Sequence, residues 1–460
     1  MTSVVIIGGG PGGYEAALVA SQLGGDVTLI EREGLGGAAV LTDCVPSKTL
    51  IATAEVMAQM QSAATLGLLT DGVRVDLDAV HRRVVELAAA QSADIRATLL
   101  ANNVRIIQGT GRLDGTEAVI ATTADGDERL PAQITLIATG TRPRELPDAL
   151  PDGERILTWK QVYELDDLPE HLVVVGSGVT GAEFASAYNS LGAKVTLVSS
   201  RDMVLPGYDE EAARVIQHVF EDRGVDIRAR ARAKAVRRKG DGVVVSLASG
   251  EEIHASHCLM AVGAVPNTEG IGLAEAGVEV EGGYIKVDRV SRTSARGVYA
   301  AGDVTGVFPL ASVAAMQGRI AMWHSLGDAV SPLNLQRVSS NVFTSPEIAT
   351  VGISQADVDS GVSVAVGVMV PLRGNARAKM QDITEGFVKL FCLPITGIIV
   401  GGVVVAPHAS ELIHAISVAV AERITVDQFS TGFTVYPSVS GSIAEAARRL
   451  HGHANLTITV

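Results

Sequence analysis

Six glycines with identical spacing are the residues of this sequence most directly suited to binding chemistry. They form two GxGxxG groups, one at Gly8, Gly10 and Gly13 and the other at Gly176, Gly178 and Gly181. In such a loop the first glycine makes a tight turn, the second lets the backbone approach a pyrophosphate, and the third lets helix and strand pack closely. One loop is a weak signal, but two copies at an offset of 168 residues (position 176 against position 8) predict two dinucleotide sites.

The residue after the second apolar segment of each copy indicates which dinucleotide binds. In the first copy it is Glu31, and a carboxylate there suits the ribose 2′-hydroxyl of FAD or NAD. In the second copy it is Ser199, followed by Ser200 and Arg201. This position lacks a carboxylate and has a nearby guanidinium, which favours a 2′-phosphate. We therefore expect NADPH in the second site, with NADH possible; the alternative is that Arg201 is only a solvated surface residue.

Each glycine loop needs a strand before it and a helix and a second strand after it. Residues 4–31 and 172–199 both follow this order: an apolar β segment, the glycines, an Ala-rich helical stretch, a glycine and a second β segment. The rest of the chain predicts helices in 50–102, 310–321, 408–424 and 441–451, short strands in 104–140 and 225–262, and alternating strands from about 336.

Composition and charge exclude several classes of protein. Hydrophobic residues make up 47% of the 460 residues and charged residues 19%, which excludes an extended disordered chain. The net charge of −14 argues against a nucleic-acid binder and against an anionic membrane surface as a partner. The longest apolar stretch, 396–407, is too short to span a membrane. The N-terminus has no basic segment typical of a signal peptide, so we expect a cytoplasmic protein.

The three cysteines, Cys44, Cys258 and Cys392, are far apart in the sequence. An odd number without a close pair argues against a disulfide framework and against a metal site. It favours a reducing compartment.

Eight segments, in order along nearly the whole chain, resemble the flavoprotein pyridine nucleotide–disulfide oxidoreductases, the family of lipoamide dehydrogenase, glutathione reductase and mercuric reductase. They are GGGPGGYEAA (8–17), GLGG…CVPSK (34–48), ATGTRP (138–143), GSGVTGAEFA (176–185), AVGAVPN (261–267), YAAGDV (299–304), FTSPEIATVG (343–352) and HASELI (408–413). The resemblance implies an α/β fold with two Rossmann-like dinucleotide-binding domains and a C-terminal α+β dimerisation domain. The FAD domain is split into 1–150 and 264–335, the NAD(P) domain spans 151–263, and 336–460 builds a homodimer with the active site at the subunit interface.

The resemblance also implies roles for individual residues. Lys48 corresponds to the family lysine that reaches toward flavin N5, and Glu183 corresponds to its partner beside the nicotinamide. Such a pair would stabilise negative charge on the reduced flavin. The residues expected to hold FAD are Gly8, Gly10, Gly13, Glu31, Lys48, Gly111, Thr139, Gly140, Gly302, Asp303 and Ala311; those expected to hold the nicotinamide coenzyme are Gly176, Gly178, Gly181, Ser199, Ser200, Arg201 and Gly263.

Two departures from the family pattern bear on the function. The family's redox disulfide lies in a context like GGTCxxxGCxPSK, whereas this chain has GGAAVLTDCVPSK, with Ala39 in place of the first cysteine and only Cys44 remaining. The family's acid–base pair lies in His-Pro-x-x-x-Glu, whereas this chain has Tyr436 and Gly441 at those positions. A dithiol relay needs two sulfurs and a base. The thiol half-reaction is therefore expected to be absent, with Cys44 either a small buried hydrophobe or a charge-transfer donor to the flavin.

These departures predict an FAD-dependent NAD(P)H:quinone oxidoreductase that passes electrons from the flavin directly to a flat, apolar acceptor. Tyr436 would either hydrogen-bond a quinone oxygen or fill space. The alternatives are a soluble pyridine-nucleotide transhydrogenase and a non-catalytic flavoprotein that acts as a redox sensor or scaffold. A metal reductase is the weakest candidate, because the chain lacks a second cysteine at the site and an N-terminal metal-binding extension.

Several polar residues are not assigned to the chemistry. His408 is expected to pack at a dimer interface, and His451 and His453 to be solvated in a polar tail. Arg373 and Arg377 are expected in a surface loop, from which they would at most steer an anionic cofactor.

Overall fold

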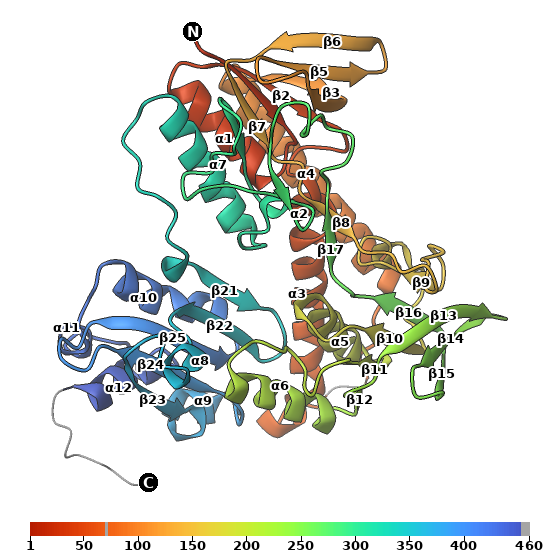
Figure 1. The fold of residues 1–460 in the computed structure, drawn as a ribbon. Helices are drawn as coiled ribbons and strands as arrows, with labels where there is room; N and C mark the ends of the chain where they lie inside the picture. The colour runs from red at the N-terminus through yellow and green to blue at the C-terminus, as the bar shows by residue number, and fades with distance from the viewer. Residues whose placement is uncertain (70–71, 452–460) are drawn as a thin grey trace.

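The computed structural model describes residues 1–69 and 72–451, and its first glycine loop follows the central strand of a parallel sheet (Figure 1). The strand order is β20-β7-β1-β2-β3. These strands are β1 (Ser3–Ile7), β2 (Asp26–Glu31), β3 (Arg105–Gln108), β7 (Ile134–Ile137) and β20 (Val298–Ala300). Val4 and Ile6 of β1 pack on helices, whereas Val5 and Ile7 pack on a second, small sheet. Both faces of β1 are covered, so its sequence is continuously apolar.

A second parallel sheet repeats this arrangement around the second glycine loop. Its order is β12-β11-β10-β16-β9. The strands are β9 (Ile156–Leu157), β10 (His171–Val175), β11 (Lys194–Val198), β12 (Asp226–Arg228) and β16 (His257–Met260). Ser3 pairs with Asp26 in the first sheet, and His171 pairs with Lys194 in the second. These pairs differ by the same offset as the glycines, so the sequence repeat is a structural repeat in register.

Helices cover one face of each sheet, and a three-stranded antiparallel sheet covers the other. The helices are α1 (Pro11–Gln22), α4 (Leu77–Ala101), α5 (Val179–Leu191), α6 (Glu210–Asp222) and α7 (Ala311–Ser325). One small sheet has the order β4 (Thr110–Leu113), β5 (Ala118–Thr123), β6 (Gly126–Pro131). The other has the order β13 (Ala233–Lys239), β14 (Gly242–Leu247), β15 (Glu252–Ala255). Helices α1 and α7 lie side by side, and a Cβ at Gly318 would come within 2.1 Å of the Gly12 carbonyl oxygen. Only glycines permit this approach.

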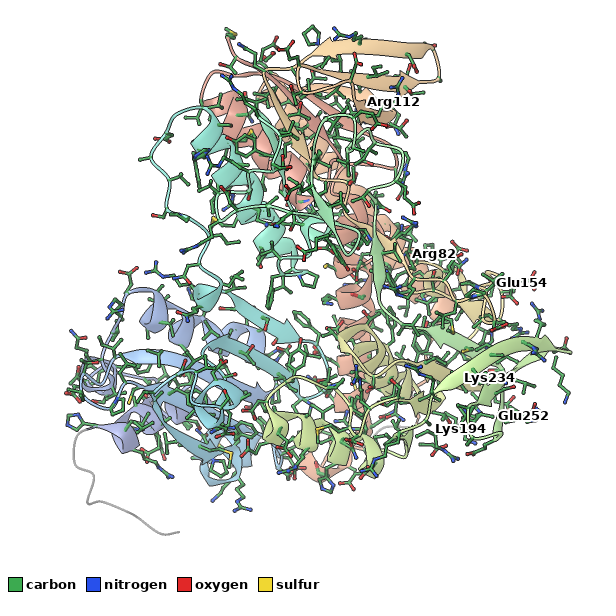
Figure 2. The ribbon with its side chains drawn as sticks, viewed as in Figure 1. Arg82, Arg112, Glu154, Lys194, Lys234 and Glu252 are labelled. Atoms are coloured by element: carbon green, nitrogen blue, oxygen red, sulfur yellow. The ribbon has the colours of Figure 1, made fainter. Side chains whose placement is uncertain are left out.

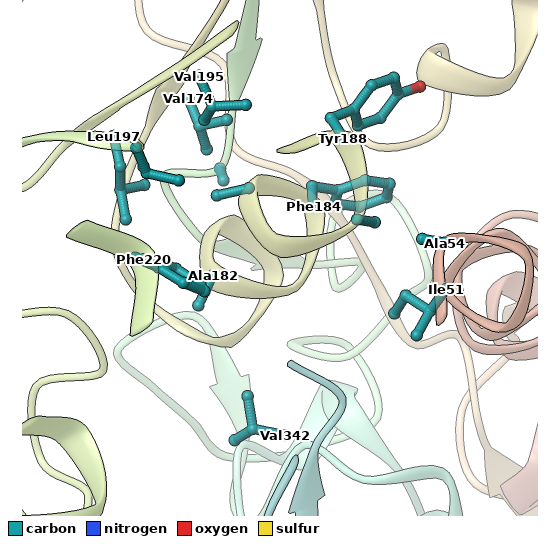
Figure 3. Packing of buried hydrophobic residues seen from close by; sticks show 14 of the residues in the cluster. Ile51, Ala54, Val174, Ala182, Phe184, Tyr188, Val195, Leu197, Phe220 and Val342 are labelled. Atoms are coloured by element: carbon teal, nitrogen blue, oxygen red, sulfur yellow. The ribbon is translucent and has the colours of Figure 1, made fainter. Parts of the chain in front are cut away.

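The long helix α3 (Cys44–Gln61) links the sheet-bearing parts and begins at the candidate site. It follows the short α2 (Gly37–Leu41) and precedes the 3-10 turn η1 (Ala63–Leu66). Figure 3 shows Ile51 and Ala54 of α3 near Phe184 of α5, in a buried cluster that also contains Val342 from the C-terminal part. Burying one such large side chain contributes about 1.5–3 kcal/mol. This cluster therefore fixes the middle of α3 relative to the second sheet.

The C-terminal part is a five-stranded antiparallel sheet of order β21-β22-β25-β24-β23 with helices packed against it. The strands are β21 (Ser339–Val342), β22 (Glu347–Gly352), β23 (Val366–Pro371), β24 (Phe387–Cys392) and β25 (Ile399–Ala406). The helices are α8 (Gln355–Asp359), α9 (Ala376–Met380), α10 (Ala409–Ala421), α11 (Val426–Ser430) and α12 (Gly441–Leu450).

Short elements join these parts. They are the ribbon of β8 (Thr141–Pro143) and β17 (Ala264–Pro266), the hairpin of β18 (Val280–Glu281) and β19 (Tyr284–Ile285), and the 3-10 turns η2 (Val162–Glu164), η3 (Asp303–Thr305), η4 (Leu335–Arg337) and η5 (Leu372–Gly374). The expected helices and strands are present, but one expectation is wrong. Arg373 and Arg377 lie on η5 and α9 rather than in a loop, because the Asn375 side chain caps α9 by accepting from the Arg377 and Ala378 amides. Both arginines are nevertheless exposed.

Most charged side chains lie on the outside of the molecule. Figure 2 labels examples such as Arg82, Arg112 and Glu154, and Arg82 forms an exposed pair with Asp78 at 3.0 Å. Such pairs contribute about 0–1 kcal/mol each. Two lysines, described below, are instead paired away from the outer surface, Lys389 in the interior and Lys48 in a cavity wall. None of the described helices is long and apolar enough to cross a membrane.

Candidate active site

A continuous cavity of about 1550 Å³ lies where the two parallel sheets, the start of α3 and the C-terminal sheet meet. Ligand sites in α/β proteins lie at the carboxyl ends of the strands, and a cavity larger than the usual 300–1,000 Å³ suits more than one ligand. Twelve of the predicted residues line it: Gly8, Gly10, Glu31, Lys48, Gly111, Thr139, Gly140, Glu183, Gly263, Gly302, Asp303 and Ala311. The structure therefore brings together residues from distant parts of the sequence.

The first glycine loop has the geometry that its spacing predicts. Gly8 has φ +104°, and a Cβ there would lie 2.3 Å from the Ala138 carbonyl oxygen. A Cβ at Gly13 would lie 1.8 Å from the Gly8 oxygen, whereas a Cβ at Gly10 would meet nothing within 4 Å. Gly10 also precedes α1, whose first residues, Pro11 and Gly12, line the cavity. This arrangement suits a pyrophosphate at the helix N-terminus.

Glu31 ends β2 with its carboxylate held by the backbone. Its Oε2 accepts a hydrogen bond from the Gly9 amide at 2.5 Å, and its Oε1 accepts one from the Glu33 amide at 2.6 Å. The side chain is buried at the cavity edge. A carboxylate fixed in this way still has lone pairs for a ribose hydroxyl.

The second glycine loop has the same backbone geometry, but its three glycines do not line the cavity, whereas Val179 and Thr180 between them do. A Cβ at Gly176 (φ +114°) would lie 2.1 Å from the Ala261 oxygen, one at Gly181 would lie 1.9 Å from the Gly176 oxygen, and Gly178 is open. Ser199 is buried, and its Oγ lies 2.7 Å from the Ser177 Oγ.

Arg201 is exposed beside this loop, as is Ser200. The neighbouring Arg230 donates to Asp202 at 2.5 Å, whereas the Arg201 guanidinium has no ion pair or hydrogen bond with any described residue. Arg201 is therefore a cation that remains available to a phosphate here.

The two residues predicted to act as a pair, Lys48 and Glu183, are in contact. The Lys48 Nζ donates to the Glu183 Oε2 at 2.8 Å, and the Phe343 amide donates to the Glu183 Oε1 at 2.9 Å. The ammonium also lies 4.8 Å from the centre of the Phe343 ring. Burial alone would lower the pKa of Lys48, but the Glu183 carboxylate raises it above its usual value. Lys48 is thus a fixed cation in the cavity wall.

Cys44 starts α3 without a second sulfur to pair with. Burial, reinforced by the adjacent Asp43 carboxylate, raises the pKa of the Cys44 thiol to about 12. Cys258 lies in β16 and Cys392 in β24, both buried, and all three cysteines are free. Ala39, at the position of the missing cysteine, also lines the cavity. A thiol with this pKa is a poor nucleophile at neutral pH.

Among the polar residues that line the cavity and that sequence reasoning missed are Asp43, Tyr208 and Asn341. Burial, only partly opposed by Lys48, raises the pKa of Asp43 to about 6, and burial raises the pKa of Tyr208 to about 12. The side-chain amide of Asn341 on β21 is buried, and neither its nitrogen nor its oxygen has a protein partner. The sequence contained a signal only for Asp43, which replaces the glycine of the GGTCxxxGCxPSK pattern.

A second lysine, which is buried, joins the C-terminal sheet to helix α6 beside the second parallel sheet. The Nζ of Lys389 on β24 donates to Asp209 and to Glu211, each at 2.6 Å. The side chains of Lys389 and Asp209 are 4% and 3% exposed. Asp209 also caps α6 by accepting from the Ala212 amide. This contact fixes the segment that carries Tyr208 into the cavity.

Tyr436 is 86% exposed in the isolated chain and does not line this cavity. Phe433 and Val435 beside it are also exposed. His408 is exposed and precedes α10 with φ +56°. His451 contacts Asp427 at 2.5 Å through its Nδ1, so it is not simply solvated, and His453 lies outside the described residues. A single chain thus presents Tyr436 away from its own cavity.

The chain was compared with known proteins. The family model described as pyridine nucleotide-disulphide oxidoreductase matches residues 2–318, and the model for the dimerisation domain of that family matches residues 338–447. A protein named NAD(P)H dehydrogenase (quinone) from Mycobacterium tuberculosis is 54% identical over all of this chain and 96% of its own length. A dihydrolipoyl dehydrogenase from Zymomonas mobilis is 34% identical over 98% of each chain.

Solved structures agree with the fold. The crystal structure of LpdA from Mycobacterium tuberculosis matches with a TM-score of 0.94 and 54% identity, over 98% of this chain and 100% of that one. The flavoprotein disulfide reductase RclA from Escherichia coli matches with a TM-score of 0.86 at 23% identity, over 97% of this chain and 99% of that one, which supports the fold alone. The predicted α/β fold with two dinucleotide-binding domains and a dimerisation domain is confirmed.

Proposed function

From the premise that this chain belongs to the pyridine nucleotide-disulphide oxidoreductase family, we propose that it is an FAD-dependent NAD(P)H:quinone oxidoreductase without a disulfide relay. The family binds FAD and NAD(P)H. The name of the 54%-identical relative supports a quinone acceptor, whereas the 34%-identical relatives are named for a dithiol, the dihydrolipoyl group. The family alone therefore does not choose between quinone chemistry and thiol–disulfide chemistry, and the choice rests on the residues of the site.

The observation that carries this choice is the environment of Cys44. Ala39 leaves Cys44 without a partner sulfur, and the thiol pKa of about 12 leaves roughly one thiolate in 10⁵ at pH 7. The Asp43 carboxylate contributes to that pKa, so the neighbouring residue itself opposes thiolate chemistry. Electrons must then leave the site without a covalent step at sulfur.

The cavity fits FAD because its glycines leave room where a Cβ would intrude or where a phosphate must approach. We propose that Gly8, Gly10, Gly13 and Glu31 hold the adenosine and pyrophosphate end, with the remaining FAD contacts made by Gly111, Thr139, Gly140, Gly302, Asp303 and Ala311. When bound, FAD supplies the capacity to take a hydride from a nicotinamide and to give two electrons to an acceptor. The Lys48 ammonium, fixed by Glu183, would stabilise the negative charge that reduction brings to this region.

We propose that the nicotinamide coenzyme binds along the second glycine loop, at Gly176, Gly178 and Gly181, with Gly263 nearby. The unpaired Arg201 beside Ser199 and Ser200 supports NADPH as the preferred form, because an arginine binds a 2′-phosphate through two charge-assisted hydrogen bonds. Glu183 is the residue that connects this half of the molecule to Lys48.

We propose that the working form is a homodimer in which Tyr436 of one copy meets the cavity of the other. The dimerisation-domain match and the exposure of Tyr436 and Phe433 support this arrangement. A phenol can hydrogen-bond a quinone oxygen without the proton abstraction that the family's histidine performs. Three free cysteines favour the cytoplasm as the site of action.

The test is anaerobic reduction of the purified protein by NADPH, followed by reoxidation with a naphthoquinone, lipoamide or oxidised glutathione. We expect a yellow protein that NADPH bleaches and that the naphthoquinone reoxidises at least 100-fold faster than either disulfide. NAD⁺ is added as a fourth acceptor, since faster reoxidation by NAD⁺ than by quinone would indicate a transhydrogenase. A folded protein that NADPH does not bleach would identify a non-catalytic flavoprotein or no flavoprotein at all.

A further inference from the structure

Asp43 is a titratable group in the cavity that the proposed function has not yet used. It immediately precedes α3 and lines the cavity. Its side chain makes no capping hydrogen bond, and no donor among the described residues reaches its carboxylate. A carboxyl group that faces a cavity without a protein partner is free to exchange a hydrogen bond with a ligand.

No nearby cation is free to balance a negative charge on Asp43. The titratable groups that face it are Cys44 and Lys48 on α3, Glu183 on α5, Asp303 on η3, and Lys160 and Tyr163 near η2. Of the two cations, Lys48 is bound to Glu183, and Lys160 lies 3.9 Å from Glu33. Two further carboxylates in the same wall disfavour a negative charge on Asp43. The protonated form is therefore accessible close to neutral pH.

Reduction of a quinone needs a proton donor as well as electrons. A quinone becomes a hydroquinone by gaining one hydride equivalent and one proton. The hydride equivalent, with both electrons, derives from NAD(P)H in the proposed reaction. The proton must come from an acid in the cavity or from water.

We propose that Asp43 is the acid that protonates the quinone oxygen, an inference that rests on the proposed quinone activity. The O–H bond of the Asp43 carboxyl group breaks while an O–H bond forms on the acceptor. The electron pair of the broken bond stays on the carboxylate. Asp43 regains its proton from water through the cavity mouth before the next turnover.

The other groups that line the cavity are less suited to this step. Cys44 and Tyr208 have pKa values of about 12, so each is a weak proton donor at neutral pH. Lys48 has a raised pKa and would leave Glu183 as an unpaired buried anion if it lost its proton. The pKa of Asp43, about 6, is close to the pH at which the enzyme must act, which is where general acids are most effective.

The test compares two acceptors in the reoxidation of the NADPH-reduced holoenzyme. A naphthoquinone needs a proton, whereas ferricyanide takes electrons alone. We expect Asp43→Asn to slow reoxidation by the naphthoquinone about 100-fold at pH 6, the lower end of what a general acid contributes. Reoxidation by ferricyanide and reduction by NADPH should stay within 2-fold. Asp43→Gly, the residue of the family pattern, should behave like Asp43→Asn, and the exposed Asp125→Asn should behave like the unmodified enzyme.

Two pH-dependent measurements complete the test. In the unmodified enzyme the naphthoquinone rate should fall as pH rises through about 6, and Asp43→Asn should flatten this profile. Infrared difference spectra of the oxidised holoenzyme between pH 5 and pH 8 should contain the carbonyl stretch of a protonated carboxyl group that Asp43→Asn removes.

Equal slowing with both acceptors would overturn the role of Asp43, because it would indicate general damage. Unchanged quinone rates in both variants, or an infrared band that persists in them, would overturn it as well. If the unmodified enzyme reacts with ferricyanide but not with the naphthoquinone, the proposed function itself is wrong, and this inference falls with it.

Discussion

Replacing Lys48 with methionine tests the buried ion pair at the centre of the proposed mechanism. The substitution keeps an unbranched side chain but removes the cation from Glu183, whose side chain is 5% exposed. At the observed 2.8 Å the attraction between two unit charges is about 6 kcal/mol for an effective dielectric constant of about 20. Part of this attraction only offsets the cost of burying the charges. Because the Lys48 side chain is 31% exposed, the free energy of unfolding should fall by less than the roughly 3–5 kcal/mol of a fully buried pair, by about 2–3 kcal/mol at pH 8.

The pH dependence of this loss has a definite sign. Burial opposes and Glu183 promotes a charged Lys48, and the net effect is a raised pKa. The pair therefore stabilises the fold fully below the ordinary lysine pKa of 10.5 and loses that effect only as pH rises through the folded value. The deficit of Lys48→Met should therefore stay constant from pH 7 to pH 10 and shrink as the pH rises above 10.5.

The same change should move the reduction potential of the bound flavin. Removing a cation that stabilises the reduced form shifts the midpoint potential in the negative direction, by about 30 mV for each 1.4 kcal/mol lost in a two-electron couple. We expect a shift of roughly 30–60 mV on this scale. Urea unfolding and spectroelectrochemical titration measure the two effects, and Lys48→Arg, which keeps the charge, serves as the control.

A double-mutant cycle with Glu183→Gln gives the decisive result. If the pair acts as described, Lys48→Met should cost far less in the Glu183→Gln background, because a neutral amide does not need a cation. Additive effects of the two substitutions would refute the reasoning. So would an unfolding deficit in Lys48→Met that does not shrink above pH 10.5.

Three further predictions follow from the neighbouring residues. Arg201→Ala should lower kcat/KM for NADPH by about 10- to 150-fold, the value of one charged hydrogen bond, and should leave kcat/KM for NADH unchanged. Steady-state kinetics with both coenzymes measure this effect. Arg230 is already paired with Asp202, so Arg230→Ala should change kcat/KM for neither coenzyme. Cys44→Ala should keep quinone turnover within 2-fold and lower the free energy of unfolding by about 1 kcal/mol. Because the thiol pKa is about 12, the unmodified enzyme should also resist alkylation by iodoacetamide at pH 7. Abolished turnover with unchanged FAD content would contradict electron transfer from the flavin directly to the quinone. Lys389→Met should lower the free energy of unfolding by about 3–5 kcal/mol at pH 8, and a comparable loss in the exposed Lys379→Met would show that burial of the pair is not the cause.

The parts of the site that sequence predicts well are those that backbone geometry dictates. Gly8 and Gly176 must be glycine because both have positive φ and lie against the carbonyl oxygen of the residue that follows the neighbouring strand, Ala138 and Ala261 respectively. The requirement for glycine repeats at a fixed spacing, so it can be recognised from the sequence alone. The matching register of the two sheets follows from the same repeat.

The parts that sequence does not predict are contacts between elements distant in the chain. The sequence around Lys389 does not indicate that its ammonium contacts Asp209 and Glu211, which lie at the start of α6. The sequence around Asn341 does not indicate that its side-chain amide is buried without a partner. The Lys48–Glu183 pair spans 135 residues, and only the resemblance to a family predicted it. Tertiary packing creates these sites, and neither spacing nor periodicity encodes it. The role of Tyr436 stays a prediction.

Residues 39–44 are best understood as one chemical unit rather than as a damaged disulfide motif. A relay through sulfur requires a thiolate, and a carboxylate next to the thiol raises its pKa and so works against that requirement. Direct transfer to a quinone requires no thiolate but does require a proton, which a carboxyl group with a pKa of about 6 can supply. Ala39 removes the second sulfur, and Asp43 introduces the acid at the same wall of the cavity. Ala39 and Asp43 therefore favour the same chemistry, and a substitution that restored only one feature of the disulfide enzymes should not restore a thiol reaction.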